Sequence, residues 1–127
     1  MSVAFNPASG LVRVGAELEG PSGISLVRLA LDTGATGTLL NVAVLVAVGY
    51  DPALAPSRVQ VTAGSGVEYA PLVTVTRLKA LGRERTAFPL LAHTLPPGAG
   101  VDGLLGLDFM RGLALSIDFR RGLIDLV

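Results

Sequence analysis

An acidic residue at the end of an apolar segment is the feature that most constrains this sequence. The chain is apolar over residues 29–31 and then places Asp32 directly before Thr33 and Gly34. A carboxylate at the exit of a core strand loses part of its hydration, which costs free energy. Such a cost suggests that the carboxylate has a chemical function. The Thr33 hydroxyl can hold the following loop, and Gly34 allows a tight backbone turn beside the acid. This arrangement indicates chemistry at Asp32.

Length and composition favour one compact β-rich domain. A chain of 127 residues suits a single domain that buries roughly two thirds of the surface its unfolded form exposes. Half of the residues are apolar, 16% are charged, and 16 Gly and 8 Pro interrupt many short apolar runs. Such a profile is typical of short strands and turns rather than disorder. We therefore predict a single domain over residues 1–127.

Charge and cysteine content exclude several function classes. Ten Lys and Arg balance ten Asp and Glu, so no broad positive surface is available for nucleic acid or an anionic membrane. The absence of Cys excludes disulfides, thiolate nucleophiles and Cys-based zinc sites. The amino terminus lacks a signal peptide pattern, and the apolar run 42–48 is too short to span a bilayer. The sequence thus predicts a soluble, cytoplasmic protein, either whole or part of a longer one.

Alternation and turn residues predict mostly strands. The predicted strands cover residues 11–18, 24–31, 58–62, 68–75, 78–81, 87–92, 103–106, 113–119 and 123–127. The first two form a hairpin that delivers Asp32 to a strand end. Asn41 is expected to cap a short helix over 42–48. Asp108 is expected to cap another over 109–111.

A glycine-rich turn between two predicted strands suggests a flap. Residues 63–66 read Ala-Gly-Ser-Gly, and such a tip favours a mobile hairpin. The functional interpretation is a flap that closes over a site. The alternative is an ordinary surface hairpin, which is the commoner structure when no acid such as Asp32 lies upstream.

Three features in this order resemble the single-domain retropepsin-like aspartic proteases. Asp32-Thr33-Gly34 follows an apolar strand, the glycine-rich hairpin comes next, and Leu-Leu-Gly at 104–106 leads into a short helix near the end. The likeness runs from about residue 12 to residue 126 and includes bacterial forms and the protease domain of DNA-damage-inducible ubiquitin-shuttle proteins. The carboxyl-terminal patterns 106–110, 117–119 and 123–124 resemble those of the same proteins.

The resemblance implies a closed, mostly antiparallel β-barrel of the acid-protease type, with a flap hairpin and one or two short helices. It implies hydrolysis of peptide bonds in extended or unfolded polypeptide. The catalytic residues would be Asp32, Thr33 and Gly34. The substrate-binding residues would be Ala35, Thr36, Thr62, Ala63, Gly64, Ser65, Gly66 and Val67.

The implied mechanism needs two carboxylates that share one proton, because two adjacent like charges do not both ionise cheaply. One chain supplies one Asp-Thr-Gly. The other acids near apolar segments lack a following Thr-Gly, namely Asp102, Asp108, Asp118 and Asp125. We therefore predict a homodimer in which the two copies of Asp32 meet at the two-fold axis. The Thr33 hydroxyl would tie the two loops together, whereas its simpler alternative is a turn hydroxyl.

One departure from the retroviral pattern supports a second hypothesis. Retroviral enzymes end the Asp-Thr-Gly-Ala motif with an acid, which pairs with an Arg after the late Gly. Here Thr36 and Leu107 occupy those positions, so both members of the ion pair are replaced together. Thr36 can donate a hydrogen bond but carries no charge. The alternative function is a catalytically silent retropepsin-like module that dimerises or binds peptides.

Other motifs carry little weight. The glycines at 98, 100 and 103 match a dinucleotide-binding pattern, but Pro96 and Pro97 precede them where a strand is required. His93 is the only histidine and is expected to have a surface or loop-packing role. No serine lies in a Gly-x-Ser-x-Gly setting. We therefore predict neither a cofactor nor a metal.

Overall fold

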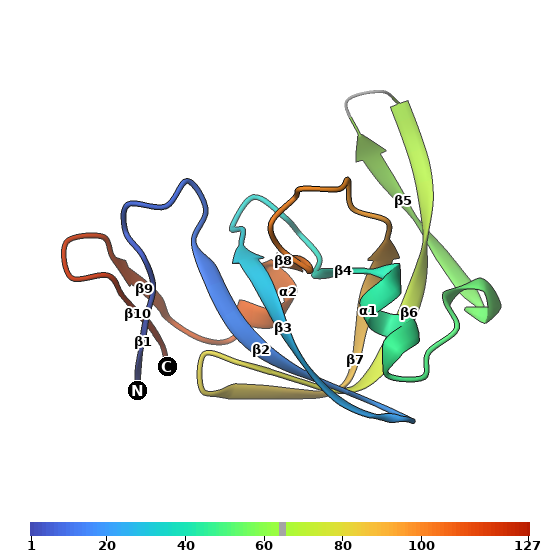
Figure 1. The fold of residues 1–127 in the computed structure, drawn as a ribbon, viewed down its shortest axis with the longest axis horizontal. Helices are drawn as coiled ribbons and strands as arrows, with labels where there is room; N and C mark the ends of the chain where they lie inside the picture. The colour runs from blue at the N-terminus through green and yellow to red at the C-terminus, as the bar shows by residue number, and fades with distance from the viewer. Residues whose placement is uncertain (64–65) are drawn as a thin grey trace.

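A ring of six strands forms the centre of the fold, as seen in a computed structural model that describes residues 1–63 and 66–127. Hydrogen-bonded neighbours follow the order β2 (Arg13–Gly20), β3 (Gly23–Leu31), β8 (Gly103–Leu105), β4 (Leu39–Asn41), β7 (Arg83–His93) and β6 (Gly66–Ala80). Pairing between β2 and β6 closes the ring (Figure 1). Strands make up 53% of the chain and helices 11%. The prediction of a closed, mostly β fold is confirmed.

Two parallel pairings in this ring position the candidate site. β3 runs parallel to β8, with Leu31 opposite Leu105, and β4 runs parallel to β7. The other pairs in the ring are antiparallel. Because parallel strands end at the same edge of a sheet, the residues that follow β3 and β8 lie side by side. Asp32 and Gly106 are those residues.

The first hairpin and the first helix form where the sequence predicts them. β2 and β3 pair from Arg13 opposite Ala30 to Gly20 opposite Gly23. α1 (Val42–Ala47) begins after Asn41, whose side chain accepts a hydrogen bond from the Ala43 N–H. A 3₁₀ turn, η1 (Pro52–Leu54), follows. No helix among the described residues is long and apolar enough to cross a membrane.

The prediction of separate strands at 68–75 and 78–81 is wrong, because β6 is continuous over both. Its buried positions change phase from Val75 to Leu78, which in the sequence resembles the end of one strand and the start of another. The strand itself continues, but its pairing with β7 skips Thr76 and Ala87. The Thr76 N–H donates to the Tyr50 hydroxyl (2.7 Å), and Ala87 has a φ of 47°. β5 (Ser57–Ala63) pairs with the other end of β6, and both project beyond the ring (Figure 1).

The chain ends form a second, three-stranded sheet. β1 (Ser2–Ala4) pairs with β10 (Leu123–Leu126), which pairs with β9 (Leu115–Asp118), both antiparallel. The sequence predicts the β9–β10 hairpin, although it places the start of the first strand earlier, and it does not predict β1. The two termini therefore lie side by side at one end of the molecule (Figure 1).

The turn between β9 and β10 is held by an exposed ion pair. The Arg121 Nε atom lies 2.7 Å from Asp118 Oδ2, and the Arg120 and Arg121 N–H groups donate to Asp118 Oδ1. The Arg121 side chain, and then its backbone N–H, lower the pKa of Asp118. Since the folded pKa is depressed, the pair stabilises the fold above the unfolded pKa. That stabilisation is lost as the pH falls through the folded pKa.

We predict that Arg121→Gln raises the pKa of Asp118 toward its ordinary value, measured by NMR titration of the carboxyl carbon. Arg120→Gln is the matched control, because Arg120 acts on Asp118 only through its backbone N–H. The control should leave the titration unchanged. Equal shifts in both variants would contradict the assigned role of the Arg121 side chain.

Candidate active site

Asp32 follows directly after β3 and is fixed there by backbone hydrogen bonds on two sides. The Leu31 N–H donates to the Val12 carbonyl (2.8 Å), and the Asp32 N–H donates to the Leu105 carbonyl (3.0 Å). Leu29 and Ala30 before it are buried, whereas Asp32 is half-buried. The end of a core strand thus holds a carboxylate at the boundary between the interior and solvent.

The residues after Asp32 form the tight turn expected from the motif. The Gly34 N–H donates to Asp32 Oδ1 (2.9 Å), and the Ala35 N–H donates to the Asp32 carbonyl (3.2 Å). Asp32 Oδ2 accepts no hydrogen bond from the described residues, and the Thr33 side chain is exposed without one. One carboxylate oxygen therefore orders the turn while the other remains available to a ligand.

A buried hydroxyl holds the far end of the Asp32 loop. Thr38 is fully buried, and its Oγ1 accepts from the Gly106 N–H (3.1 Å) while donating to Asp108 Oδ1 (2.7 Å). The Thr38 N–H also donates to the Asp108 carboxylate, at 2.9 and 3.0 Å. We call this network of Thr38, Gly106 and Asp108 the loop clamp. It joins the loop after β3 to the segment after β8.

The predicted role of Asp108 as a helix cap is wrong. α2 (Leu107–Met110) contains Asp108 within its first turn, and Gly106 occupies the N-cap position with no side-chain cap. Asp108 instead accepts from Thr38, which lies far away in sequence. Thr38 offers two donors in a partly buried setting, whereas a capping position offers exposed amide groups that water can satisfy.

Gly106 is required because two backbone segments touch at this point. A Cβ atom there would lie 2.6 Å from the Gly37 carbonyl carbon and 2.9 Å from the Ala35 carbonyl oxygen. The Leu107 N–H donates to the same Ala35 carbonyl (2.8 Å). Any side chain at 106 would push the Asp32 loop away from β8.

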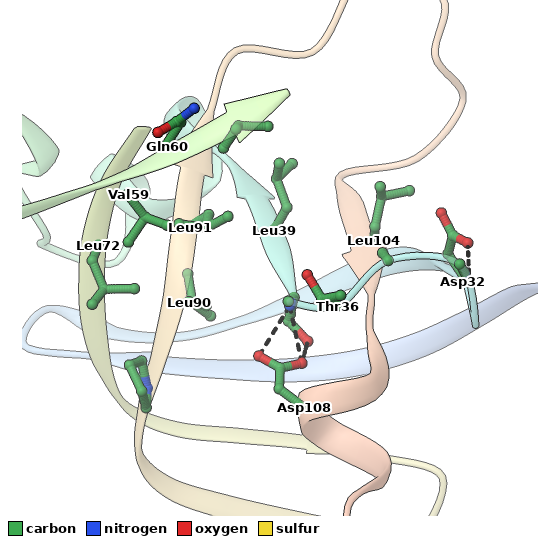
Figure 2. Close-up of a pocket in the computed structure, with 16 residues that line it drawn as sticks. Asp32, Thr36, Leu39, Val59, Gln60, Leu72, Leu90, Leu91, Leu104 and Asp108 are labelled. Atoms are coloured by element: carbon green, nitrogen blue, oxygen red, sulfur yellow. Dashed lines mark hydrogen bonds between the residues drawn. The ribbon is translucent and has the colours of Figure 1, made fainter. Parts of the chain in front are cut away.

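A cavity of about 700 Å³ opens beside Asp32. Figure 2 shows Asp32 at one end and Val59 and Leu72 at the other, with Leu39 and Leu104 between them. The two acids among its described lining residues are Asp32 and Asp108, and no basic side chain lines it. The cavity thus has a carboxylate at one end, and most of its other lining side chains are apolar.

The structure brings together some of the predicted site residues. Gly34, Ala35 and Thr36 line the cavity with Asp32. Thr33 lies in the same turn but is not among the lining residues. Gly66 and Val67 begin β6 and are exposed outside the described cavity lining. Thr62 and Ala63 end β5, where only their backbone is described, and Gly64 and Ser65 lie outside the described residues.

Sequence reasoning missed most of the apolar wall. The lining residues not predicted for the site come from the Asp32 loop, β4, β5, β6, β7, β8 and α2: Gly37, Thr38, Leu39, Val59, Gln60, Val61, Leu72, Pro89, Leu90, Leu91, Leu104 and Asp108. Apolar strand residues look the same in sequence whether they face a core or a cleft. The only available signal was the position of Val59 to Val61 at the base of the predicted flap.

Two of the other singled-out residues, Asp102 and His93, have polar partners elsewhere in the fold. Asp102 Oδ2 accepts from the Arg28 N–H (2.8 Å). His93 Nε2 lies 3.7 Å from Glu68 Oε2, which joins the end of β7 to β6. Thr36 is exposed, and Leu107 starts α2. Within the described part of the chain, no three His, Asp or Glu side chains gather as metal ligands.

The closed barrel and the clamped Asp32 loop define a retropepsin-like fold, as the sequence resemblance implies. A model of the family described as aspartyl protease matches residues 14–109, and the chain belongs to this family. A retropepsin-like aspartic protease from Rickettsia conorii is similar in structure (TM-score 0.68, 21% identity, 99% of this chain and 88% of that one).

A second solved structure is similar over almost its whole length. It is the retroviral protease-like domain of Ddi1 from Leishmania major (TM-score 0.62, 17% identity, 94% of this chain and 95% of that one). At these identities the two structures support the fold. No curated protein sequence matches the chain.

We predict that Thr38→Val destabilises the protein by about 1–3 kcal/mol, because it leaves the buried Gly106 N–H without its acceptor and removes a donor to Asp108. Chemical denaturation measures the loss. Thr36→Val is the matched control, since the Thr36 hydroxyl is exposed and makes no hydrogen bond to the described residues. The control should change stability by less than about 0.5 kcal/mol. Similar losses in both variants would contradict the clamp.

Proposed function

We propose that this chain is an aspartic endopeptidase that acts as a homodimer on extended or unfolded polypeptide. The observation that carries the proposal is the Asp32 carboxylate. It is half-buried at the end of an apolar cavity, with Oδ1 held by Gly34 and Oδ2 unengaged by the described residues. A carboxylate in this setting is suited to binding and activating water. Membership of the aspartyl protease family supports the same chemistry.

The dimer follows from the count of suitable acids. Asp108, the second acid beside the cavity, is occupied by three hydrogen bonds from Thr38. Asp108 therefore holds the Asp32 loop in place, and we do not assign it as the second carboxylate of a pair with Asp32. A second copy of Asp32, brought by a symmetric partner, supplies the missing group. The Thr33 side chain is exposed, and in the proposed dimer its hydroxyl would bond across this axis.

The reaction uses the two copies of Asp32 as acid and base. The ionised copy takes a proton from water as the water oxygen attacks the peptide carbonyl carbon, and the protonated copy donates its proton to the carbonyl oxygen. The C–N bond then breaks as the first copy protonates the leaving nitrogen. The second copy accepts a proton from the tetrahedral intermediate. This restores the starting pair, with one proton shared between two like charges.

Substrate would lie extended in the cavity, with backbone groups paired like an added strand. Ala35 and Thr36 line the cavity beside Asp32. The β5–β6 hairpin, with residues 62–67 at its end, would close over the peptide as a flap. Its base already contributes Val59, Gln60 and Val61 to the cavity, which supports this role.

We predict that Asp32→Asn abolishes cleavage of an unfolded protein across acidic to neutral pH while the dimer is retained. Cleavage is followed by gel and mass spectrometry, and the dimer by sedimentation. Asp51→Asn is the matched control: Asp51 caps η1, and Asn caps equally well, so its activity should be unchanged. Equal cleavage by wild type and Asp32→Asn would refute the assignment. No cleavage by wild type at any pH or concentration would favour the silent module.

A mixing experiment tests whether two chains share one site. Adding Asp32→Asn chains to wild type under subunit exchange should form heterodimers with a single active carboxylate. At roughly tenfold excess of the variant, random pairing leaves about one tenth of the wild-type activity. Adding the same amount of Asp51→Asn should raise total activity instead. Activity unaffected by excess Asp32→Asn would show that each chain works alone.

A further inference from the structure

A second cavity lies between the amino-terminal segment and the first hairpin. Its volume is about 500 Å³, and its lining includes Phe5, Asn6, Ser9, Leu11, Arg13 and Arg28. We call it the arginine cavity. It shares no described lining residue with the cavity beside Asp32, so its chemistry is separate from the proposed proteolysis.

The two arginines lie on the same face of the hairpin, and none of the described residues that line the arginine cavity is acidic. Arg13 pairs with Ala30, and Arg28 precedes Ala30 by two residues, so the two are diagonal neighbours on one face. Like charges so placed repel each other. Neither guanidinium forms an ion pair among the described residues, and Asp102 bonds to the Arg28 backbone N–H rather than to its side chain.

Two uncharged polar side chains line the arginine cavity, and each accepts a hydrogen bond from the protein while still offering a donor. Asn6 Oδ1 accepts from the Ala8 N–H (3.0 Å), which leaves the Asn6 amide N–H groups free. Ser9 Oγ accepts from Arg13 Nη1 (2.6 Å), which leaves its hydroxyl hydrogen. Asn6 and Ser9 thus still have donors to offer, and the two guanidiniums have donors and no acceptor. A cavity lined in this way matches an anion.

Arg13 is already held in place by the protein, whereas the Arg28 guanidinium is available to bind a ligand. Arg13 is half-buried, held by Ser9 and by a hydrogen bond from its Nε to the Gly100 carbonyl (3.3 Å). Arg28 is exposed, and its guanidinium has no hydrogen-bond partner among the described residues. Because Arg13 is already ordered, binding has little side-chain entropy to lose there. The Arg28 guanidinium can donate a bidentate pair of hydrogen bonds to an oxyanion.

We propose that the arginine cavity binds an oxyanion, either a phosphate-type or a carboxylate group, with Arg28 as the main ligand and Arg13, Ser9 and Asn6 as supporting donors. A bound oxyanion relieves the repulsion between the two arginines. It also joins the amino-terminal segment to the hairpin that carries Asp32. Its source is either a free anion or an acidic or phosphorylated side chain of a bound polypeptide.

Titration of the 127-residue chain with inorganic phosphate at constant ionic strength tests the proposal. NMR of the arginine Nε–Hε groups should show saturable shifts at Arg13 and Arg28, and phosphate should raise the melting temperature relative to chloride. Arg28→Gln should weaken phosphate binding by about tenfold or more and remove the thermal shift. Arg111→Gln is the matched control, because Arg111 is exposed and lines none of the described cavities.

Two results would overturn the proposal: shifts that rise linearly without saturation, or equal phosphate affinity in wild type and Arg28→Gln. The melting measurement keeps the test valid if the variant is less stable, because only the increment caused by phosphate is compared. Titration with a phosphoserine peptide and its serine counterpart then identifies the source. Tighter binding of the phosphopeptide than of inorganic phosphate points to a polypeptide, and equal binding points to a free anion.

Discussion

The loop clamp is the interaction on which the geometry of the candidate site depends. A hydroxyl has one donor hydrogen and can accept at the same time, and Thr38 uses both properties by accepting from Gly106 and donating to Asp108. Its carbonyl also accepts from Leu91 on β7 (2.9 Å). One buried residue therefore connects the Asp32 loop to three other parts of the barrel. A side chain without a hydroxyl would leave buried partners unsatisfied, which is costly.

Barrel closure explains why such a clamp can form at all. The parallel β3–β8 pair places Asp32 and Gly106 at one edge of the sheet, although seventy-odd residues separate them in sequence. The β2–β6 pairing closes the ring and fixes the position of β3. Gly106 then lets the two loops approach within backbone contact. The site is thus a product of the topology, and the Asp-Thr-Gly motif alone does not create it.

Elements that depend on neighbouring residues could be predicted from the sequence. Features that depend on contacts between residues far apart in the chain could not. Strand alternation and the Asn41 cap identified the first hairpin and α1, since both depend on neighbouring residues. Asp108 was misassigned, because an acid in the first turn of a helix resembles a cap until a distant donor such as Thr38 is known. β1 was missed because its pairing partner is β10 at the other end of the chain. The apolar wall of the cavity was missed because the same apolar residue types line a cleft and fill a core.

The clamp also bears on how two chains would assemble into the proposed dimer. Within one chain, the Asp32 loop is already held by hydrogen bonds through Leu105, Gly106 and Asp108. Thr36 and Leu107 carry no charge with which to order the loop through an ion pair. In the proposed dimer, each chain would therefore bring its Asp32 loop already ordered. Association of two such halves loses little loop entropy, so the replacement of the retroviral ion pair does not by itself prevent the two carboxylates from meeting in register.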